Sequence, residues 1–269
     1  MLREREDNMI LALDVGNTHI VVGCIENGKI CNIERIRTET SATSSEYAIK
    51  LSDILHYMHT DKEIFEGAII SSVVPPVTTE LKTAVERITG KECLIVGPGI
   101  KTGMNVLIDD PATLGADLVV GGVAAITYYG TPAIIIDMGT ATTVTLVDKN
   151  GAFRGGAIMP GVNLSFSALT SGTSLLPGIY IETPEKVIGT DTVGCMQSGA
   201  IYGTAAMIDG LIDRMEEELG YPCRYIATGG LASAVIPSCR HEIIYDDDLL
   251  LKGLWTLYEK NRKERKDRK

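Results

Sequence analysis

Two similar stretches of sequence, MILALDVGNT at residues 9–18 and AIIIDMGTA at residues 133–141, decide the fold. Each is a short apolar run that ends in an aspartate, followed by a glycine and a hydroxyl residue. This pattern is typical of a buried strand that ends in a turn. In each copy an Asn-Gly pair, at residues 27–28 and 150–151, follows the aspartate by 13 residues. Asn-Gly between alternating apolar runs predicts a β-hairpin, because a type I′ turn needs two residues that tolerate positive φ. The chain therefore contains one hairpin plan twice.

The loop at the end of each first strand has the composition of an anion site. Asp14 and Asp137 end the two strands, and the glycine and hydroxyl residues after them can turn backbone N–H groups toward a phosphate. Two such loops facing each other would form a phosphate clamp.

The segments that follow each hairpin alternate between helical and strand patterns. Apolar residues recur at helical spacing in some segments, and short buried runs lie between them. We therefore expect an α/β fold of two lobes with the same βββαβαβ plan. The expected elements are helix 45–57, strand 68–74, a helix starting at Pro75-Pro76, strand 93–96, helix 115–129, helix 192–219, strand 224–227 and helix 249–260.

Composition excludes several classes of protein. The chain has 269 residues, of which 45% are hydrophobic and 22% charged, so it is neither disordered nor of low complexity. Its net charge of −10 argues against a broad surface for nucleic acid or anionic lipid. No apolar run reaches the roughly 18 to 20 residues of a membrane helix, and the charged start MLREREDNM lacks the apolar core of a signal peptide. We expect a cytoplasmic protein that contacts no membrane.

Common metal and nucleotide motifs are missing as well. The six cysteines contain no CxxC pair and the four histidines no HExxH, which argues against structural zinc and a disulfide framework. The chain has no GxxxxGK[ST] motif, and GPGIKTG at 97–103 has a threonine where GxGxxG needs its last glycine. A P-loop kinase is therefore excluded, the threonine argues against a Rossmann dinucleotide site, and no GxSxG motif suggests a hydrolase.

The order of the motifs resembles a known superfamily. DVGNT at 14–18, DMGTAT at 137–142 and TGG at 228–230 resemble the superfamily of acetate kinase, sugar kinases, Hsp70 and actin, which binds ATP between two duplicated lobes. Within it, further motifs make residues 9–260 similar to type III pantothenate kinase. They are SSVVP at 71–75, GPGIKTG at 97–103, DPATLGAD at 110–117 and GGAIMPG at 155–161.

The resemblance implies a fold, a reaction and partners. It implies two duplicated ribonuclease H-like (actin-like ATPase) lobes with the nucleotide cleft between them, and a homodimer. The expected boundaries are a charged extension at 1–8, a first lobe at 9–130, a second lobe at 131–260 and a basic tail at 261–269. The implied reaction is ATP-dependent phosphorylation of pantothenate to 4′-phosphopantothenate, the first step of coenzyme A biosynthesis.

The resemblance also implies which residues bind the nucleotide and the ions. Asp14 is a candidate ligand of the Mg²⁺ that accompanies ATP, and Asp137 of a monovalent cation, K⁺ or NH₄⁺. A lone aspartate suits Mg²⁺, which takes one or two carboxylates and phosphate oxygens. The implied nucleotide-binding residues are Asp14, Val15, Gly16, Asn17, Thr18, His19, Ile20 and Val21 in the first loop, Gly139, Thr140 and Thr142 in the second, and Gly229 and Gly230 in the adenosine turn.

Asp117 is the candidate general base. The pKa of a primary hydroxyl lies far above neutrality, so phosphoryl transfer benefits from a carboxylate that orients the hydroxyl and accepts its proton late in the reaction. Asp117 stands where the family's GAD motif carries that base. An alternative role is helix capping, since an aspartate in the first turn of a helix also favours the helix dipole. Both roles can coexist.

The substrate site departs from the family pattern. The implied substrate residues are Gly115, Ala116, Asp117, Leu118 and Thr192. The family usually has arginine at the position of Leu118, where it contacts the carboxylate of pantothenate, and often an aromatic residue at that of Ile108. Leucine cannot make the bidentate contact that arginine makes with a carboxylate. Either another group of this chain binds the carboxylate of pantothenate, or the substrate is a different one. Lys101, Arg154 and Lys186 are the candidate cations.

Two further alternatives stay open at this stage. Thr192 matches a threonine that contacts pantothenate across a dimer interface, but Asp191 or Thr192 also suits a helix N-cap. The rival functions are a kinase for another small hydroxy acid and a non-catalytic regulatory protein on the same fold. The retention of Asp14, Asp117 and Asp137 favours a kinase, because a binding module needs no positioned base.

Overall fold

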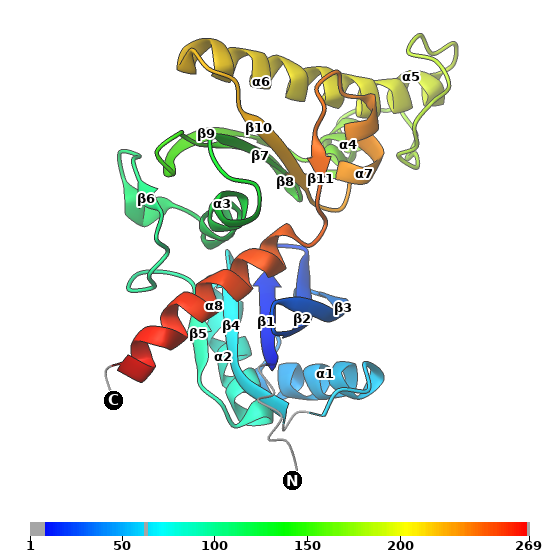
Figure 1. The fold of residues 1–269 in the computed structure, drawn as a ribbon. Coiled ribbons are helices and arrows are strands. Elements are labelled where there is room, and N and C mark those ends of the chain that lie inside the picture. The colour runs from blue at the N-terminus through cyan, green and yellow to red at the C-terminus, as the bar shows by residue number, and fades with distance from the viewer. Residues whose placement is uncertain (1–8, 62–63, 268–269) are drawn as a thin grey trace. The chain divides into compact units, whose positions relative to one another are not determined.

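The computed structural model describes residues 9–61 and 64–267, and the expected extension at 1–8 lies outside them. The chain forms two compact units (Figure 1). Unit 1 comprises the chain up to Gly103, residues 110–127 and the chain from Leu249 onward. Unit 2 comprises residues 104–109 and 128–248.

Unit 1 contains a five-stranded sheet with the strand order β3-β2-β1-β4-β5. β1 pairs antiparallel with β2 and parallel with β4. The strands are β1 (Met9–Val15), β2 (His19–Glu26), β3 (Lys29–Arg37), β4 (Phe65–Ser72) and β5 (Cys93–Ile95). The helices are α1 (Ser44–Tyr57), α2 (Pro75–Thr89), the 3₁₀ helix η2 (Pro111–Thr113), α3 (Ala116–Tyr128) and α8 (Leu249–Asp267).

Local signals explain where the first two helices begin and end. Thr43 and Glu46 form a capping box at the start of α1, with each side chain bonded to the backbone of the other residue. Pro75 and Pro76 open α2, where a missing N–H costs nothing, and Gly90 ends it in the left-handed conformation at φ 64°. The expected helix at 45–57 and the expected helix start at Pro75-Pro76 are both confirmed.

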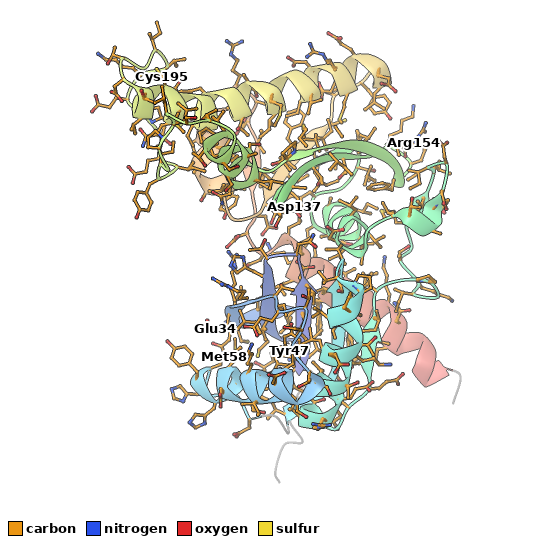
Figure 2. The ribbon with its side chains drawn as sticks, turned by 180° about the vertical axis from the view of Figure 1, so that it is seen from behind. Glu34, Tyr47, Met58, Asp137, Arg154 and Cys195 are labelled. Atoms are coloured by element: carbon orange, nitrogen blue, oxygen red, sulfur yellow. The ribbon has the colours of Figure 1, made fainter. Side chains whose placement is uncertain are left out.

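The two faces of the unit 1 sheet are covered by different helices. Side chains of α1 and α2 pack with one face of β1 and β4 in an apolar core, and Tyr47 on α1 is fully buried there (Figure 2). α8 crosses the opposite face (Figure 1), where Gly23 and Gly67 leave room for Leu251 and Tyr258. The sheet therefore lies between two helical layers.

Unit 2 repeats this topology. Its six-stranded sheet has the order β11-β10-β7-β8-β9-β6. Read from β9 to β11, this order is the same third-second-first-fourth-fifth sequence as in unit 1, so the predicted duplication is confirmed. The strands are β6 (Asn105–Val106), β7 (Ala133–Met138), β8 (Ala141–Val147), β9 (Ala152–Pro160), β10 (Arg224–Thr228) and β11 (Ile244–Tyr245).

The expected long helix at 192–219 is continuous but changes its winding. It consists of α5 (Thr192–Ser198), a π-helical turn η3 (Gly199–Gly203) and α6 (Thr204–Leu219). Side chains of η3 and α6 pack in an apolar core with β7, β8 and β10. The other helices of unit 2 are α4 (Val162–Ser171), α7 (Ala232–Val235) and the 3₁₀ helix η4 (Ile236–Ser238).

The division of the chain differs from the expected boundaries in two segments, and the boundary expected after residue 130 lies before Tyr128. The C-terminal helix, expected at 249–260 in the second lobe, belongs to unit 1 as α8, because Tyr258 fills the space that Gly67 leaves on β4. Residues 104–109, expected in the first lobe, belong to unit 2, because β6 pairs with β9 and Leu107 N donates to Phe153 O at 2.8 Å. Most of the expected basic tail continues α8.

The two predicted hairpins are confirmed, but their turns differ. Asn27 and Gly28 both have positive φ, as a type I′ turn requires. In the second hairpin only Gly151 has positive φ. There the carboxylate of Asp148 accepts hydrogen bonds from the backbone N–H of Asn150 and of Ala152, which stabilises a different turn.

None of the helices in the described residues combines the length and the apolar character that a membrane crossing requires.

Candidate active site

The first loop, between β1 and β2, is tied to the end of β3. Gly16 N donates to His19 O at 3.0 Å, and Thr38 donates from Oγ1 to Gly16 O at 2.7 Å and from its N–H to Thr18 O at 3.0 Å. Asn17, Thr18 and His19 are exposed, whereas Val15 and Ile20 are buried in the core. Val15 and Ile20, which are among the predicted nucleotide-binding residues, could therefore contact a nucleotide only through their main-chain groups.

Asp14 stands at the end of β1 and is half-buried. In the register of the sheet its parallel neighbour on β4 is Ser71, and its antiparallel neighbour on β2 is Val21. Leu13, Val15 and Ile70 all belong to the core under α1 and α2. Because side chains alternate along a strand, Asp14 and Ser71 point together to the other face, which α8 covers.

Asp117 is held in the first turn of α3. Its Oδ1 accepts a hydrogen bond from the backbone N–H of Leu118 at 2.8 Å. A side chain at Gly115 would collide with Asp117 Oδ1 and would approach Val73 Cγ1, so this turn lies beside the chain that follows β4. Asp117 lies inside the first turn, after the start of α3 at Ala116, so it can favour the helix dipole and serve as a base at once.

The environment of Asp117 suits a base. Burial raises the pKa of its carboxyl above the usual value for aspartate, and the hydrogen bond from Leu118 N opposes this shift. The charged form is desolvated and so gains more from taking up a proton than an exposed carboxylate does. A carboxylate with a raised pKa is a stronger base in the same position.

The second loop, between β7 and β8, is built by close backbone contacts within unit 2. Gly139 N donates to Ala141 O, and Gly161 N to Thr140 O, each at 3.0 Å. A Cβ at Gly161 would collide with the carbonyl oxygens of Gly139 and Thr140. At Gly229, with φ +98°, a Cβ would lie 2.6 Å from the carbonyl carbon of Met138. The GGAIMPG and TGG motifs thus both pack against the DMGTA loop.

Asp137, at the end of β7 (Figure 2), has hydroxyl residues as neighbours on both sides. Thr143 is its antiparallel partner on β8 and Thr228 its parallel partner on β10. The hydroxyls of Thr142 and Thr143 are buried without a hydrogen-bond partner in the described part of the chain. Carboxylate and hydroxyl oxygens are hard donors of the kind that K⁺ and other hard cations prefer, so the residues present fit a monovalent cation.

Thr192 lines a hollow of about 640 Å³ in unit 2. Asp191 is the N-cap of α5, because its Oδ1 accepts the N–H of Gly194 at 2.9 Å, so the capping role does not fall to Thr192. The walls are mostly apolar. They are formed by Phe166, Leu169, Leu176, Gly189, Thr190, Asp191, Thr192, Cys195, Met196 and Gly199.

The three candidate cations for a substrate carboxylate differ in their contacts. Arg154 forms an ion pair with Asp148 at 3.2 Å, in the turn between β8 and β9. The backbone of Lys101 is bonded on both sides to the amide of Asn261 on α8. Lys186 is exposed in the segment before α5. Leu118 itself is half-buried on α3 and offers no charge.

No group of three or more His, Cys, Asp and Glu side chains in the described residues could hold a metal ion. Asp14 fits Mg²⁺ in the other way that this ion is commonly bound, with one carboxylate and the remaining positions taken by water and substrate phosphates.

Comparison with known proteins identifies the family. A model of the type III pantothenate kinase family matches residues 10–214. The type III pantothenate kinase of Bacillus cytotoxicus is 41% identical over 253 residues, which are 94% of this chain and 97% of that protein. The chain belongs to the type III pantothenate kinase family. As a member it is a kinase that phosphorylates pantothenate with ATP, the step that opens coenzyme A biosynthesis.

Solved structures show the fold. A conserved protein of Campylobacter jejuni assigned to the Baf family of transcriptional activators matches with a TM-score of 0.59 and 16% identity, over 94% of this chain and 99% of that one. A polyphosphate/ATP-glucomannokinase from Arthrobacter matches with a TM-score of 0.50 and 13% identity, over 94% and 100%. The expected fold class is confirmed.

Two residues of this site were not predicted from the sequence. Ser71 and Thr143 become candidates only through their register with Asp14 and Asp137. The available signal was a polar residue at the end of an apolar strand, in AIISS at 68–72 and in ATTVT at 141–145. This signal is weak, because serine and threonine are common at strand ends.

Proposed function

We propose that this chain transfers the γ-phosphoryl group of ATP to the primary hydroxyl of pantothenate, with Asp117 as the general base. The observation that carries the assignment is the desolvated carboxylate of Asp117, held by Leu118 N in the turn of the DPATLGAD motif. Its raised pKa matches the task of accepting a proton that leaves the acceptor hydroxyl late in the reaction.

In this mechanism the loops position the nucleotide, and Asp117 accepts the proton of the acceptor hydroxyl. The exposed residues Asn17 and Thr18 present the first loop to the phosphates, and Asp14 is the carboxylate that Mg²⁺ would use. When bound, Mg²⁺ supplies neutralisation of the phosphate charge. Asp117 orients the acceptor hydroxyl for in-line attack and takes its proton as the new oxygen–phosphorus bond forms, while the bond from the γ-phosphorus to the β,γ-bridging oxygen breaks and ADP leaves. ATP as donor also places the reaction in the cytoplasm in this proposal.

The second loop would hold the rest of the nucleotide and a monovalent cation. Gly229 and Gly230 form the adenosine turn in this proposal, and the close approach of Gly229 to Met138 supports a shared site with Gly139, Thr140 and Thr142. Asp137 and the hydroxyl of Thr143 would bind K⁺ or NH₄⁺. The support is the set of hard oxygen donors around Asp137, and no step of the transfer passes through this ion.

Pantothenate would be bound by residues 115–118 and, in a homodimer, by Thr192 of the second copy. Apolar side chains on the segment before α5 support association of two copies. Leu175, Tyr180 and Ile188 are each more than 80% exposed there, and Leu176 and Gly189 of the same segment line the hollow together with Thr192. Single exposed apolar residues are common, but several together mark an interaction surface.

The experiment measures ADP release from Mg·ATP with pantothenate, with other small hydroxy acids and without acceptor, in K⁺ and then in Na⁺. Turnover that requires pantothenate and is faster in K⁺ supports the substrate and the cation together. Turnover only with another hydroxy acid would make Leu118 a determinant of specificity, and binding of ATP without any turnover would favour a regulatory protein. Sedimentation of the same sample tests the dimer.

A further inference from the structure

Three side-chain hydroxyls are buried without a hydrogen-bond partner among the described residues: those of Ser71, Thr142 and Thr143. Buried polar groups are nearly always bonded, and an exception often marks the place of an ordered water or an ion. Thr143 neighbours Asp137 and Thr142 follows the second loop directly, while Ser71 neighbours Asp14. Thr143 and Ser71 thus lie beside the two strand-end aspartates of the duplicated fold, whereas Thr142 pairs with Met138 on the other face of its sheet.

Ser71 differs sharply from the serine that follows it. The hydroxyl of Ser72 accepts the N–H of Val74 at 3.1 Å and the hydroxyl of Thr78 at 2.7 Å, so it is part of the start of α2. The side chain of Ser71 is fully buried and makes no such contact in the described residues. If Ser71 had a purely structural role, we would expect its hydroxyl to make hydrogen bonds within the protein, as that of Ser72 does.

The position of Ser71 points to Asp14, the proposed ligand of the divalent cation. The two residues are paired in register at the carboxyl ends of β4 and β1 and face the same side of the sheet. Val73, two residues after Ser71, lies beside the turn that carries Asp117. In parallel sheets of α/β proteins, ligands bind at this end of the strands.

We propose that Ser71 is a positioning residue whose hydroxyl donates a hydrogen bond to the oxygen shell of the divalent cation at Asp14. A serine hydroxyl can donate to a carboxylate oxygen or to a bound water and can also accept, so it suits a hydrated ion. Mg²⁺ keeps several waters when it is held by few carboxylates, and those waters need partners. The inference rests on the proposed role of Asp14 in nucleotide binding.

The proposal predicts an unusual combination of effects for Ser71→Ala. The variant loses no hydrogen bond that the described structure makes, so its melting temperature should equal or exceed that of the unchanged protein. Its affinity for Mn²⁺ with the non-hydrolysable analogue AMPPNP should fall about three- to tenfold, as expected for one lost hydrogen bond to a bound ion's shell.

Thr89→Val is the matched control. Thr89 is a buried hydroxyl of the same unit, but it donates to Val85 O at 2.8 Å and accepts from Lys91 N at 3.2 Å at the far end of α2. This variant should melt at a lower temperature and bind Mn²⁺·AMPPNP unchanged. Ser71→Ala should therefore weaken metal binding without lowering the melting temperature, and Thr89→Val should do the reverse.

The binding experiment uses the full chain, with bound Mn²⁺ followed by electron paramagnetic resonance and metal-free AMPPNP measured in parallel by calorimetry. Weaker binding of Ser71→Ala with Mn²⁺ and equal binding without metal supports the proposal. Equal affinity in both conditions overturns it, and so does the same loss with and without metal, which would place the hydroxyl on the nucleotide. If the unchanged protein fails to bind Mn²⁺·AMPPNP, the nucleotide-binding function itself is wrong.

Discussion

Replacing Asp117 by asparagine separates its proposed chemical role from its structural one. Asparagine has the same shape, and its side-chain oxygen can still accept the hydrogen bond that Leu118 N donates at 2.8 Å. The first turn of α3 should therefore keep its geometry. What disappears is the negative charge and the ability to accept the proton of the acceptor hydroxyl.

The expected loss in turnover is about 10²- to 10⁴-fold, the usual contribution of a positioned base. At about 1.4 kcal/mol for each factor of ten this corresponds to roughly 3 to 5 kcal/mol of transition-state stabilisation. Turnover is measured as ADP release at saturating ATP and pantothenate. Asp110→Asn is the control: Asp110 is exposed in the same motif, and its carboxylate accepts the N–H of Ala112, as the side chain of asparagine also can.

The pH dependence gives the same variant a second readout. Because burial raises the pKa of Asp117, kcat/KM should fall as the pH drops through that raised value, above the usual range of aspartate. The raised pKa also means that the charged carboxylate destabilises the folded state at neutral pH. Asp117→Asn should therefore melt at a higher temperature than the unchanged protein at neutral pH, and the difference should shrink toward acid pH. Near-normal turnover of the variant, or a lower melting temperature at neutral pH, would refute this reasoning.

Three further predictions test the second loop and the division into units. Gly229→Ala should destabilise the protein by about 1 to 3 kcal/mol, because φ is +98° and a Cβ would lie 2.6 Å from the carbonyl carbon of Met138; thermal unfolding checks this against Gly230→Ala, where a Cβ meets nothing within 4 Å. Thr143→Val should raise the K⁺ concentration for half-maximal ADP release about three- to tenfold and leave the melting temperature unchanged; an unaltered K⁺ titration would exclude Thr143 from the ion site. Gly67→Ala should cost about 1 to 3 kcal/mol by pushing Tyr258 and α8 off the sheet; a neutral result in urea unfolding would contradict the packing of α8 on unit 1.

The parts of the fold that were predicted from the sequence are those that local patterns determine. The strand-end aspartates, the hairpins and the start of α2 at Pro75 each follow from a few adjacent residues. The placement of α8 could not be predicted in this way. It depends on Gly67 and Tyr258, which are far apart in the chain and meet in the folded structure.

The same reasoning explains which candidate site residues could be proposed from the sequence. The motif glycines and aspartates occur in recognisable local contexts, so a resemblance could assign them. The neighbours Ser71 and Thr143 are set by strand register, and a shift of one residue would turn each of them to the other face of its sheet. Register is a property of the paired strands, which the sequence of a single strand does not contain.

The two copies of the hairpin plan have the same topology but different surroundings, and this difference assigns them different tasks in our proposal. In unit 1 the loop after Asp14 is exposed and fixed by Thr38, and the turn beside β4 carries a desolvated base. In unit 2 the loop after Asp137 is also exposed, but Gly161 and Gly229 allow neighbouring backbone to pack closely against it. A loop beside a base suits the reacting end of the nucleotide. A loop built from close backbone contacts and buried hydroxyls suits groups that are bound without reacting. The two copies therefore differ in two physical respects: glycines allow close backbone packing in unit 2, and a desolvated acid lies beside the loop in unit 1.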